Sequence, residues 1–205
     1  MLSKLAVAGL LAAALLHAQQ LTDVERKFFS SADDALGLHP GAAIADVGTG
    51  HSLGNPDRIA EKVGPKGRVI CVDVKPSIVS DIRAHVASNP LANIDAVLGK
   101  EDDPQLAADT FDGILVSNSY HEFTQPSAML KHLYTALKPN GRLVVLELYS
   151  TSHKNDSRAE QVKRHDISPD ILEQELSAAG FVIKERIDGV PLTADRCRCL
   201  FRAEK

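Results

Sequence analysis

Two closely spaced glycines after an apolar run could let a nucleoside approach the backbone. The stretch ADVGTGHS, residues 45–52, places Asp46 at the end of the run, followed by Gly48 and Gly50. Glycine allows a turn with positive φ and a close approach of a ligand to the chain. Because a short glycine motif alone is weak evidence, the interpretation depends on the residues that end the other apolar runs.

A carboxylate ends the next apolar run. Asp73 lies at the tip of VICVDVKP, 23 residues beyond Gly50. A carboxylate can accept two hydrogen bonds at once, and at this distance from a glycine turn it typically holds a pair of ribose hydroxyls. The two strand ends together indicate a nucleoside site. The alternative, in which Asp73 only caps a helix or faces solvent, stays open.

A third polar cluster, SNSYHEF, follows a later apolar run. Asn118, Tyr120, His121 and Glu122 supply hydrogen-bond donors and acceptors, and the histidine titrates near neutral pH. These side chains could transfer a proton or orient a reactant. They could equally hold the loop together by hydrogen bonds.

The elements that must position these residues alternate along the chain. Apolar runs predict strands, and segments with helical periodicity separate them; helix start signals are Asn55 before Pro56 and Ser168 before Pro169. The predicted strands are AAIADV, RVICVDV, DAVL, FDGILVS, RLVVLEL, FVIKERI and RCRCLF. Such alternation predicts a doubly wound α/β fold, a mostly parallel sheet with helices on both faces. Ligands bind such sheets outside the carboxyl ends of the strands, where the polar residues lie.

Composition fits one globular domain. The chain has 205 residues, 44% of them apolar and 24% charged, and a formal net charge of -4. Binders of phosphate backbones usually show a basic face, and base-stacking surfaces need aromatic residues, which make up only 4% here. We therefore expect no nucleic-acid partner. The predicted domain covers residues 19–205, with a helical lead-in over 19–40.

The first 18 residues have the pattern of a secretory signal. Lys4 precedes an apolar run from Leu5 to Leu16, and the predicted cleavage follows Ala18. The run is shorter than the roughly 20 residues that span a bilayer, so we expect no stable membrane span. Cleavage implies export to the periplasm or the medium. The alternative is a helix that stays and packs or anchors, which would leave the protein cytoplasmic or membrane-associated.

The three cysteines predict neither a disulfide framework nor a metal site. Cys71 lies in an apolar run, and Cys197 and Cys199 lie two residues apart, a spacing at which an extended chain rarely forms a disulfide. We expect free thiols. The cysteines and histidines also lack the spacing of a metal site, so no metal is assigned.

Five ordered motifs resemble the class I S-adenosylmethionine-dependent methyltransferases, in particular small bacterial ones with YHE or YHH after the fourth strand. The motifs are AIADVGTGHS, VICVDVKP, FDGILVSNSYHEF, LKPNGRLVVLELY and AAGF, and the resemblance covers about residues 25–203. It implies a Rossmann-like sheet of seven strands with an antiparallel last strand. It also implies S-adenosylmethionine as the cofactor and methyl transfer to an unidentified small-molecule acceptor.

The resemblance also implies roles for individual residues. Asp46, Gly48 and Gly50 would surround the methionine part of the cofactor, Asp73 would hold the ribose, and Glu101 or Asp102 would accept the adenine amine. Asn118 would lie with them at the cofactor, and an acidic cleft suits a ligand that carries an ammonium and a sulfonium.

The same resemblance places SNSYHEF beside the transferred methyl group. His121 is the first candidate for a catalytic base, Glu122 its candidate orienting partner, and Tyr120 either acts there or packs against the cofactor. Glu147 and His165 are candidates to face the acceptor, although a solvated surface explains most charges of that region.

One position departs from the family pattern. Ser52 stands where a third glycine is usual, and the segment from Gly50 to KVGPKG is longer than usual. Ser52 could contribute a hydroxyl to the cofactor, or the rebuilt loop could bind it weakly. Two alternatives therefore remain: a non-catalytic nucleoside-binding protein on the same fold, and an NAD(P)-dependent oxidoreductase, which is disfavoured because the SNSYHEF and LKPNG motifs fit methyl transfer better.

Overall fold

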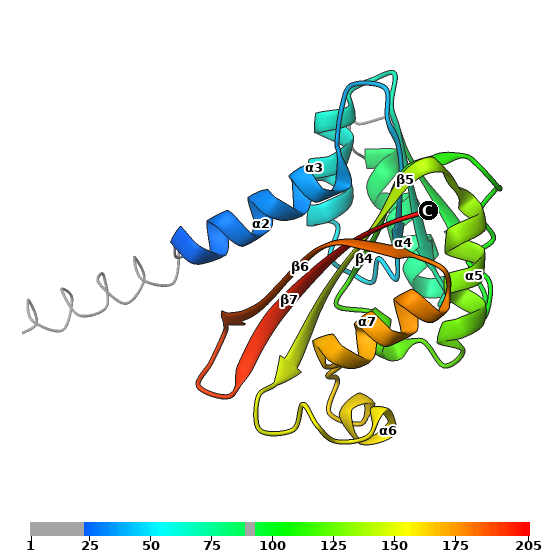
Figure 1. The fold of residues 1–205 in the computed structure, drawn as a ribbon. Helices are drawn as coiled ribbons and strands as arrows, with labels where there is room; N and C mark the ends of the chain where they lie inside the picture. Colours follow the sequence, from blue (N-terminus) through cyan, green and yellow to red (C-terminus); the bar gives the residue numbers. More distant parts are fainter. Residues whose placement is uncertain (1–22, 89–92) are drawn as a thin grey trace, which may run out of the picture.

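The computed structural model describes residues 23–88 and 93–205, so the predicted signal sequence lies outside the described part. Within these ranges, strands β1 to β7 form one sheet in the order β3-β2-β1-β4-β5-β7-β6 (Figure 1). Their bounds are β1 Ala43–Val47, β2 Arg68–Asp73, β3 Ile94–Leu98, β4 Phe111–Ser117, β5 Leu137–Ser150, β6 Val182–Pro191 and β7 Arg196–Glu204. β7 runs antiparallel to β5 and β6, and the other pairs are parallel. The predicted fold class is confirmed.

Helices cover both faces of the sheet. Their bounds are α2 Asp23–Leu36, α3 Gly54–Val63, α4 Pro76–Ser88, the 3-10 turn η1 Tyr120–Glu122, α5 Pro126–Ala136, α6 Arg158–Val162 and α7 Pro169–Ala178. One buried apolar cluster joins α2, α3 and α4 to the sheet, with Ile59 and Val63 at 0% exposure. The other joins α5 and α7 to the opposite face, with Leu133 and Leu172 at 0%. Apolar side chains on both sides explain the nearly continuous hydrophobic strands.

The predicted start of one helix is wrong by two residues. α3 begins at Gly54, so Asn55 and Pro56 lie inside its first turn. Proline is tolerated there because the first N–H groups of a helix have no intrahelical acceptor. Asn55 does not cap the helix; its Oδ1 accepts a 3.2 Å hydrogen bond from Arg58. The prediction for α7 is confirmed, with Ser168 as N-cap and proline as the first helical residue.

The sheet order reverses at β1, and this reversal creates the crevice for a ligand. β1 pairs with β2 on one side and with β4 on the other, both in parallel. The chain therefore leaves the carboxyl ends of β1 and β4 toward opposite faces of the sheet, which opens a space between the two connections. The predicted cofactor residues all lie at or just after the carboxyl ends of β1, β2, β3 and β4.

The cysteines are free thiols. Cys71 and Cys199 are buried, and Cys197 is partly buried. Burial raises the pKa of the Cys71 thiol to about 12 and also raises that of Cys199, so both stay protonated and unreactive at neutral pH. Across residues 23–88 and 93–205, no helix has the length and apolar character needed to cross a membrane.

Candidate functional site: a nucleoside cavity at the sheet switch point

A cavity of about 600 Å³ lies at the carboxyl ends of β1, β2 and β4. It brings together eight residues that the sequence predicted for the site: Asp46, Gly48, Gly50, Ser52, Asp73, Glu101, Asn118 and Glu122. These residues come from four separate segments of the chain. The predicted convergence of strand ends on one site is therefore seen in the structure.

The glycine turn after β1 needs glycine for two separate reasons. Gly48 and Gly50 have φ of 75° and 61°, where side chains other than glycine are strained. A Cβ on Gly48 would also lie 2.5 Å from the side chain of Ser119, whereas a Cβ on Gly50 would meet nothing within 4 Å. Sequence reasoning missed Ser119, which is buried and donates through Oγ to the carbonyl of Val47 at 3.0 Å.

Asp73 is fixed by two backbone hydrogen bonds. Its Oδ2 accepts from the N–H of Gly50 at 3.0 Å, and its Oδ1 accepts from the N–H of Lys75 at 2.9 Å. The side chain is 8% exposed and lines the cavity. Each carboxylate oxygen can accept more than one hydrogen bond. Asp73 can therefore hold the glycine turn and still accept two hydroxyl groups from a ligand.

Asp46 is buried under the turn. Its side chain is 2% exposed, and burial raises the pKa of the carboxyl group to about 7. Thr49, a second residue that sequence reasoning missed, donates its hydroxyl to the Asp46 carbonyl at 2.8 Å and lines the cavity. A ligand with a positive charge beside Asp46 would favour the ionised carboxylate.

The two acidic candidates after β3 lie in different places. Glu101 lines the cavity, and its Oε2 accepts a 3.0 Å hydrogen bond from Thr124. Asp102 is exposed and does not belong to the cavity lining. The sequence left both acidic residues open as candidates. Of the two, only Glu101 lies where a ligand in the cavity can contact it.

The cavity also has an apolar wall. Val74 follows Asp73 directly, and Ile78, Phe123 and Met129 come from α4, the end of η1 and α5. Val74 is 46% exposed, which is unusual for a valine and marks an apolar surface that a flat ring could cover. Acidic groups beside an apolar wall suit a ligand with sugar, aromatic and cationic parts.

Asn118 separates this cavity from a smaller one of about 180 Å³. Ser117 and Asn118 line both cavities, and Asn118 has a φ of 52°, a conformation that asparagine adopts more readily than most residues. The smaller cavity is also lined by Phe28, Leu146, Glu147, Leu148, Leu192 and Arg198. A second small reactant can thus approach a ligand in the large cavity beside Asn118.

His121 has a nearer carboxylate partner that the sequence did not predict. The His121 Nδ1 atom lies 3.0 Å from Oε2 of Glu147, while the Nε2 atom lies 4.0 Å from Oε1 of Glu122. Glu147 is 2% exposed and also accepts the backbone N–H of His121 at 3.1 Å. A glutamate inside the apolar run LVVLELY is the sequence signal for this pair, because a buried carboxylate needs a partner.

The position of His121 argues against a catalytic base. Burial lowers the pKa of the imidazole, but the hydrogen bond and negative charge of Glu147 outweigh burial and raise it above its ordinary value. His121 also lies outside the lining of both cavities. The structure therefore gives His121 a positioning role.

Tyr120 does not line the large cavity. Its side chain is 0% exposed, and its hydroxyl donates to Oε2 of Glu175 on α7 at 2.7 Å. Arg158 donates to the other Glu175 oxygen at 2.7 Å. Burial and the neighbouring carboxylate raise the pKa of Tyr120 well above its usual range. Tyr120 therefore connects η1 to α7, and neither a catalytic role nor contact with the cofactor is supported.

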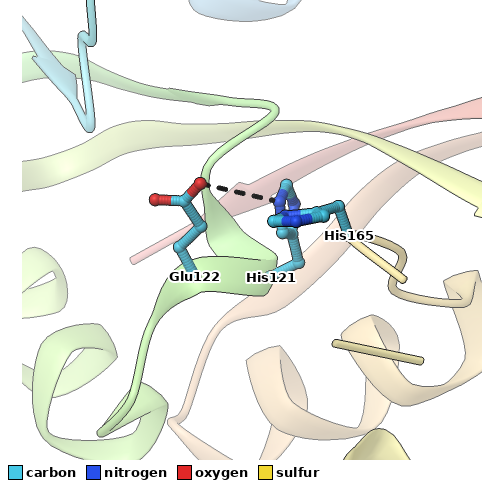
Figure 2. A group of neighbouring side chains, drawn as sticks. All are labelled: His121, Glu122 and His165. Carbon is cyan, nitrogen blue, oxygen red and sulfur yellow. Dashed lines mark ion pairs between the residues drawn. The ribbon is translucent and has the colours of Figure 1, made fainter. Parts of the chain in front are cut away.

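The two histidines of the segment between β5 and α7 differ. His153 is exposed and lies 3.1 Å from Asp156. His165 lies against His121, with ring centroids 5.5 Å apart and the planes nearly perpendicular. Figure 2 shows His165 and His121 beside Glu122, although the three residues come from two segments.

The fold and the cavity define a class of protein: a doubly wound α/β domain with a ligand-sized cavity at the switch point of its sheet. Residues 38–180 match the family described as a methyltransferase domain, and the chain belongs to this family. The matched range includes every residue assigned above to the large cavity.

The chain matches only part of the length of its curated relatives. The arsenite methyltransferase of Halobacterium salinarum is 26% identical over 56% of this chain and 29% of the relative. The ubiquinone/menaquinone biosynthesis C-methyltransferase UbiE of Hydrogenovibrio crunogenus is 28% identical over 60% of this chain and 49% of the relative. The chain thus spans half or less of the length of these relatives.

Solved structures share the fold at low identity. A SAM-dependent methyltransferase from Aquifex aeolicus has a TM-score of 0.69 at 22% identity and covers 88% of this chain and 89% of its own. The [4+2]-cyclase SpnF has a TM-score of 0.74 at 17% identity, with 87% and 80% covered. The same fold thus occurs in proteins whose names describe different reactions.

Proposed function

We propose that this protein binds S-adenosylmethionine in the large cavity and transfers its methyl group to a small molecule. The observation that carries the proposal is the convergence of Asp46, the Gly48–Gly50 turn and Asp73 on one cavity, in a chain of the methyltransferase-domain family. The names of the relatives support methyl transfer, since they include C-methyltransferases and an O-methyltransferase.

Each part of the cofactor has a matching surface. The ribose hydroxyls donate to Asp73, the adenine packs on the wall formed by Val74 and its neighbours, and Glu101 accepts from the exocyclic amine. Asp46 lies on the methionine side, where the ammonium and sulfonium favour its ionised form. The methyl group then points toward Asn118, where the second cavity begins.

The second cavity is the proposed site of the acceptor. Its volume of about 180 Å³ suits a small molecule or one group of a larger molecule. Methyl transfer needs the acceptor atom, the methyl carbon and the sulfur in line. Asn118, which borders both cavities, is placed to orient the acceptor by hydrogen bonds.

Calorimetric titration of residues 19–205 tests the proposal. Binding of S-adenosylmethionine and S-adenosylhomocysteine at micromolar concentration, with none of NAD, is expected. NAD binding without the other two would favour the oxidoreductase instead. A chain that binds neither methionine nucleoside would contradict the cofactor assignment.

A second candidate is a nucleoside-binding protein that does not transfer methyl groups. Ser52 replaces the usual third glycine and is exposed at the cavity, and His121 lines neither cavity. Binding of both nucleosides without formation of S-adenosylhomocysteine across a panel of phenol, thiol, amine and carboxylate acceptors would favour this candidate.

We also propose export of the mature chain from the signal pattern of residues 1–18. Expression of the full sequence in a bacterium with an outer membrane, followed by mass spectrometry of the periplasmic protein, should give Gln19 as the first residue. An uncleaved chain in the cytoplasm would contradict export. S-adenosylmethionine is made in the cytosol, so export would require a supply of cofactor or a different ligand outside.

A further inference from the structure

We infer that His121, Glu122 and His165 form a binding site for a divalent transition-metal ion of the Zn²⁺ type at the edge of the cofactor cavity. One potential ligand atom from each side chain lies within 4.8 Å of the other two. Figure 2 shows the three side chains pointing toward a common space. Two imidazoles and one carboxylate form a typical ligand set for a zinc ion that keeps an open coordination position.

The separations suit a shared ion after small movements. Zn²⁺ binds nitrogen and oxygen at about 2.0–2.2 Å, so two ligands at a tetrahedral angle lie about 3.4 Å apart. The Nε2 atom of His121 lies 4.0 Å from Oε1 of Glu122. Glu122 and His165 are exposed, so rotation of their side chains can close the remaining distance, while His121 stays fixed.

Glu147 orients the central ligand. Its carboxylate binds Nδ1 of His121 at 3.0 Å and leaves Nε2 directed toward Glu122. Histidines that bind metals almost always use their second nitrogen in this way, because a carboxylate fixes the ring and strengthens the ligand. A metal ion would take the place of the proton on Nε2.

His165 is held in an unusual backbone conformation. Its φ is 55°, which is uncommon outside glycine. The next residue, Asp166, is 4% exposed and pairs with Arg196, which also donates to the His165 carbonyl at 3.1 Å. Buried neighbours thus hold an exposed histidine against His121. Strain retained at an exposed polar residue indicates a function for the side chain.

The place of this site has a consequence that rests on the proposed function. Glu122 lines the large cavity, and Glu147, the partner of His121, lines the second cavity, so the ion would lie close to both the proposed cofactor and the proposed acceptor. An acceptor hydroxyl or thiol bound to the ion loses its proton to water. A lone pair on the acceptor oxygen or sulfur then forms the bond to the methyl carbon. The bond between the methyl carbon and the cofactor sulfur breaks, and the electron pair of that bond stays on the cofactor sulfur. The metal site therefore favours an acceptor with an acidic oxygen or sulfur.

Metal binding can be measured without any methyl transfer. Titration of the untagged, chelator-treated chain with Zn²⁺ should show one ion bound at micromolar concentration or below, and X-ray absorption of the complex should show two imidazole ligands. Glu122→Gln and His165→Asn should each weaken binding at least tenfold. Asparagine is chosen at 165 because it tolerates positive φ.

A matched control separates the cluster from other histidines. His153→Asn removes an exposed histidine of the same segment and should leave Zn²⁺ affinity unchanged. Absence of Zn²⁺ binding in the parent chain, or equal loss in all three variants, would overturn the site. His121→Ala is not used because it would leave Glu147 buried without its partner.

Two further readouts separate the metal site from the acceptor and the cofactor. The Co²⁺-loaded chain should change its visible spectrum when 2-mercaptoethanol is added, because the thiolate occupies an open position. No change would overturn the inferred class of acceptor and leave the metal site standing. S-adenosylmethionine binding with EDTA present tests the proposed function alone.

Discussion

The N–H of Gly50 donates to Oδ2 of Asp73 at 3.0 Å, which joins the turn after β1 to the end of β2. The two residues that the sequence assigned to different parts of one ligand thus stabilise each other before any ligand arrives. Preorganisation of this kind lowers the ordering cost of binding.

Replacement of Asp73 should weaken cofactor binding. Asp73→Ala removes both acceptors for the ribose hydroxyls, and we expect a loss of roughly 1–3 kcal/mol, or about 5- to 150-fold in Kd, in calorimetric titration. Asp95→Ala removes the same charge on β3, outside the cavity lining, and serves as the control. Unchanged affinity in Asp73→Ala would reject the ribose assignment.

The acidic pair after β3 allows a sharp comparison. Glu101→Gln should weaken S-adenosylmethionine by a few-fold, because the amide keeps one oxygen but loses its charge. Asp102→Asn makes the same change at a neighbouring exposed residue outside the lining and should have no effect. A larger loss of affinity in Asp102→Asn than in Glu101→Gln would indicate that Asp102, and not Glu101, contacts the adenine.

Parts of the site that depend on local sequence could be predicted. The strand ends at Asp46 and Asp73 and the glycine turn follow from short patterns, because a parallel sheet brings the carboxyl ends of its strands together. The partner of His121 could not be found this way, since Glu147 lies 26 residues away in the chain. Glu122, adjacent in sequence, is the more distant of the two carboxylates, with its Oε1 atom 4.0 Å from Nε2 of His121.

Tyr120 illustrates the same limit. Its neighbours in the motif suggest a site residue, yet its hydroxyl binds Glu175, 55 residues away. The segment before α7 also contains α6, which the polar sequence of that region did not predict. Only the packing of α7 on the sheet decides these contacts.

The Gly48–Gly50 turn offers a test of the two reasons for glycine. Gly50→Ala changes only the conformational preference and should destabilise by roughly 1–2 kcal/mol. Gly48→Ala adds a clash with Ser119 and should cost at least about 1 kcal/mol more. Urea unfolding of both variants measures the difference. Equal losses would show that the turn moves freely away from Ser119.

Tyr120 should matter for stability and little for the cofactor. Tyr120→Phe removes one hydrogen bond to a carboxylate, and we expect a loss of roughly 1–3 kcal/mol in the free energy of unfolding. A double-mutant cycle with Glu175→Gln isolates this pair. S-adenosylmethionine affinity should stay within about twofold. If Tyr120→Phe instead lost much of its affinity for S-adenosylmethionine at unchanged stability, Tyr120 would have to contact the cofactor.

Asp46 should make stability depend on pH. Its pKa is raised from 3.8 to about 7, so the folded chain holds a proton that the unfolded chain releases above pH 4. This contribution is fully present below about pH 4 and is lost as the pH rises through 7, at up to about 1.4 kcal/mol per pH unit. Asp46→Asn lacks it. From pH 4 to pH 7, the free energy of unfolding of the parent chain should therefore fall relative to that of the Asp46→Asn variant.

The same carboxyl group should couple cofactor binding to pH. A cofactor ammonium beside Asp46 lowers its pKa, so binding releases a proton and affinity rises with pH from 5.5 to about 7. Measurements end below about pH 7.5, because an α-amino group begins to lose its own proton near pH 8. Calorimetry in two buffers of different ionisation enthalpy counts the released proton. Asp46→Asn should show neither the proton release nor the rise, and a parent chain with flat affinity over this range would place the ammonium elsewhere.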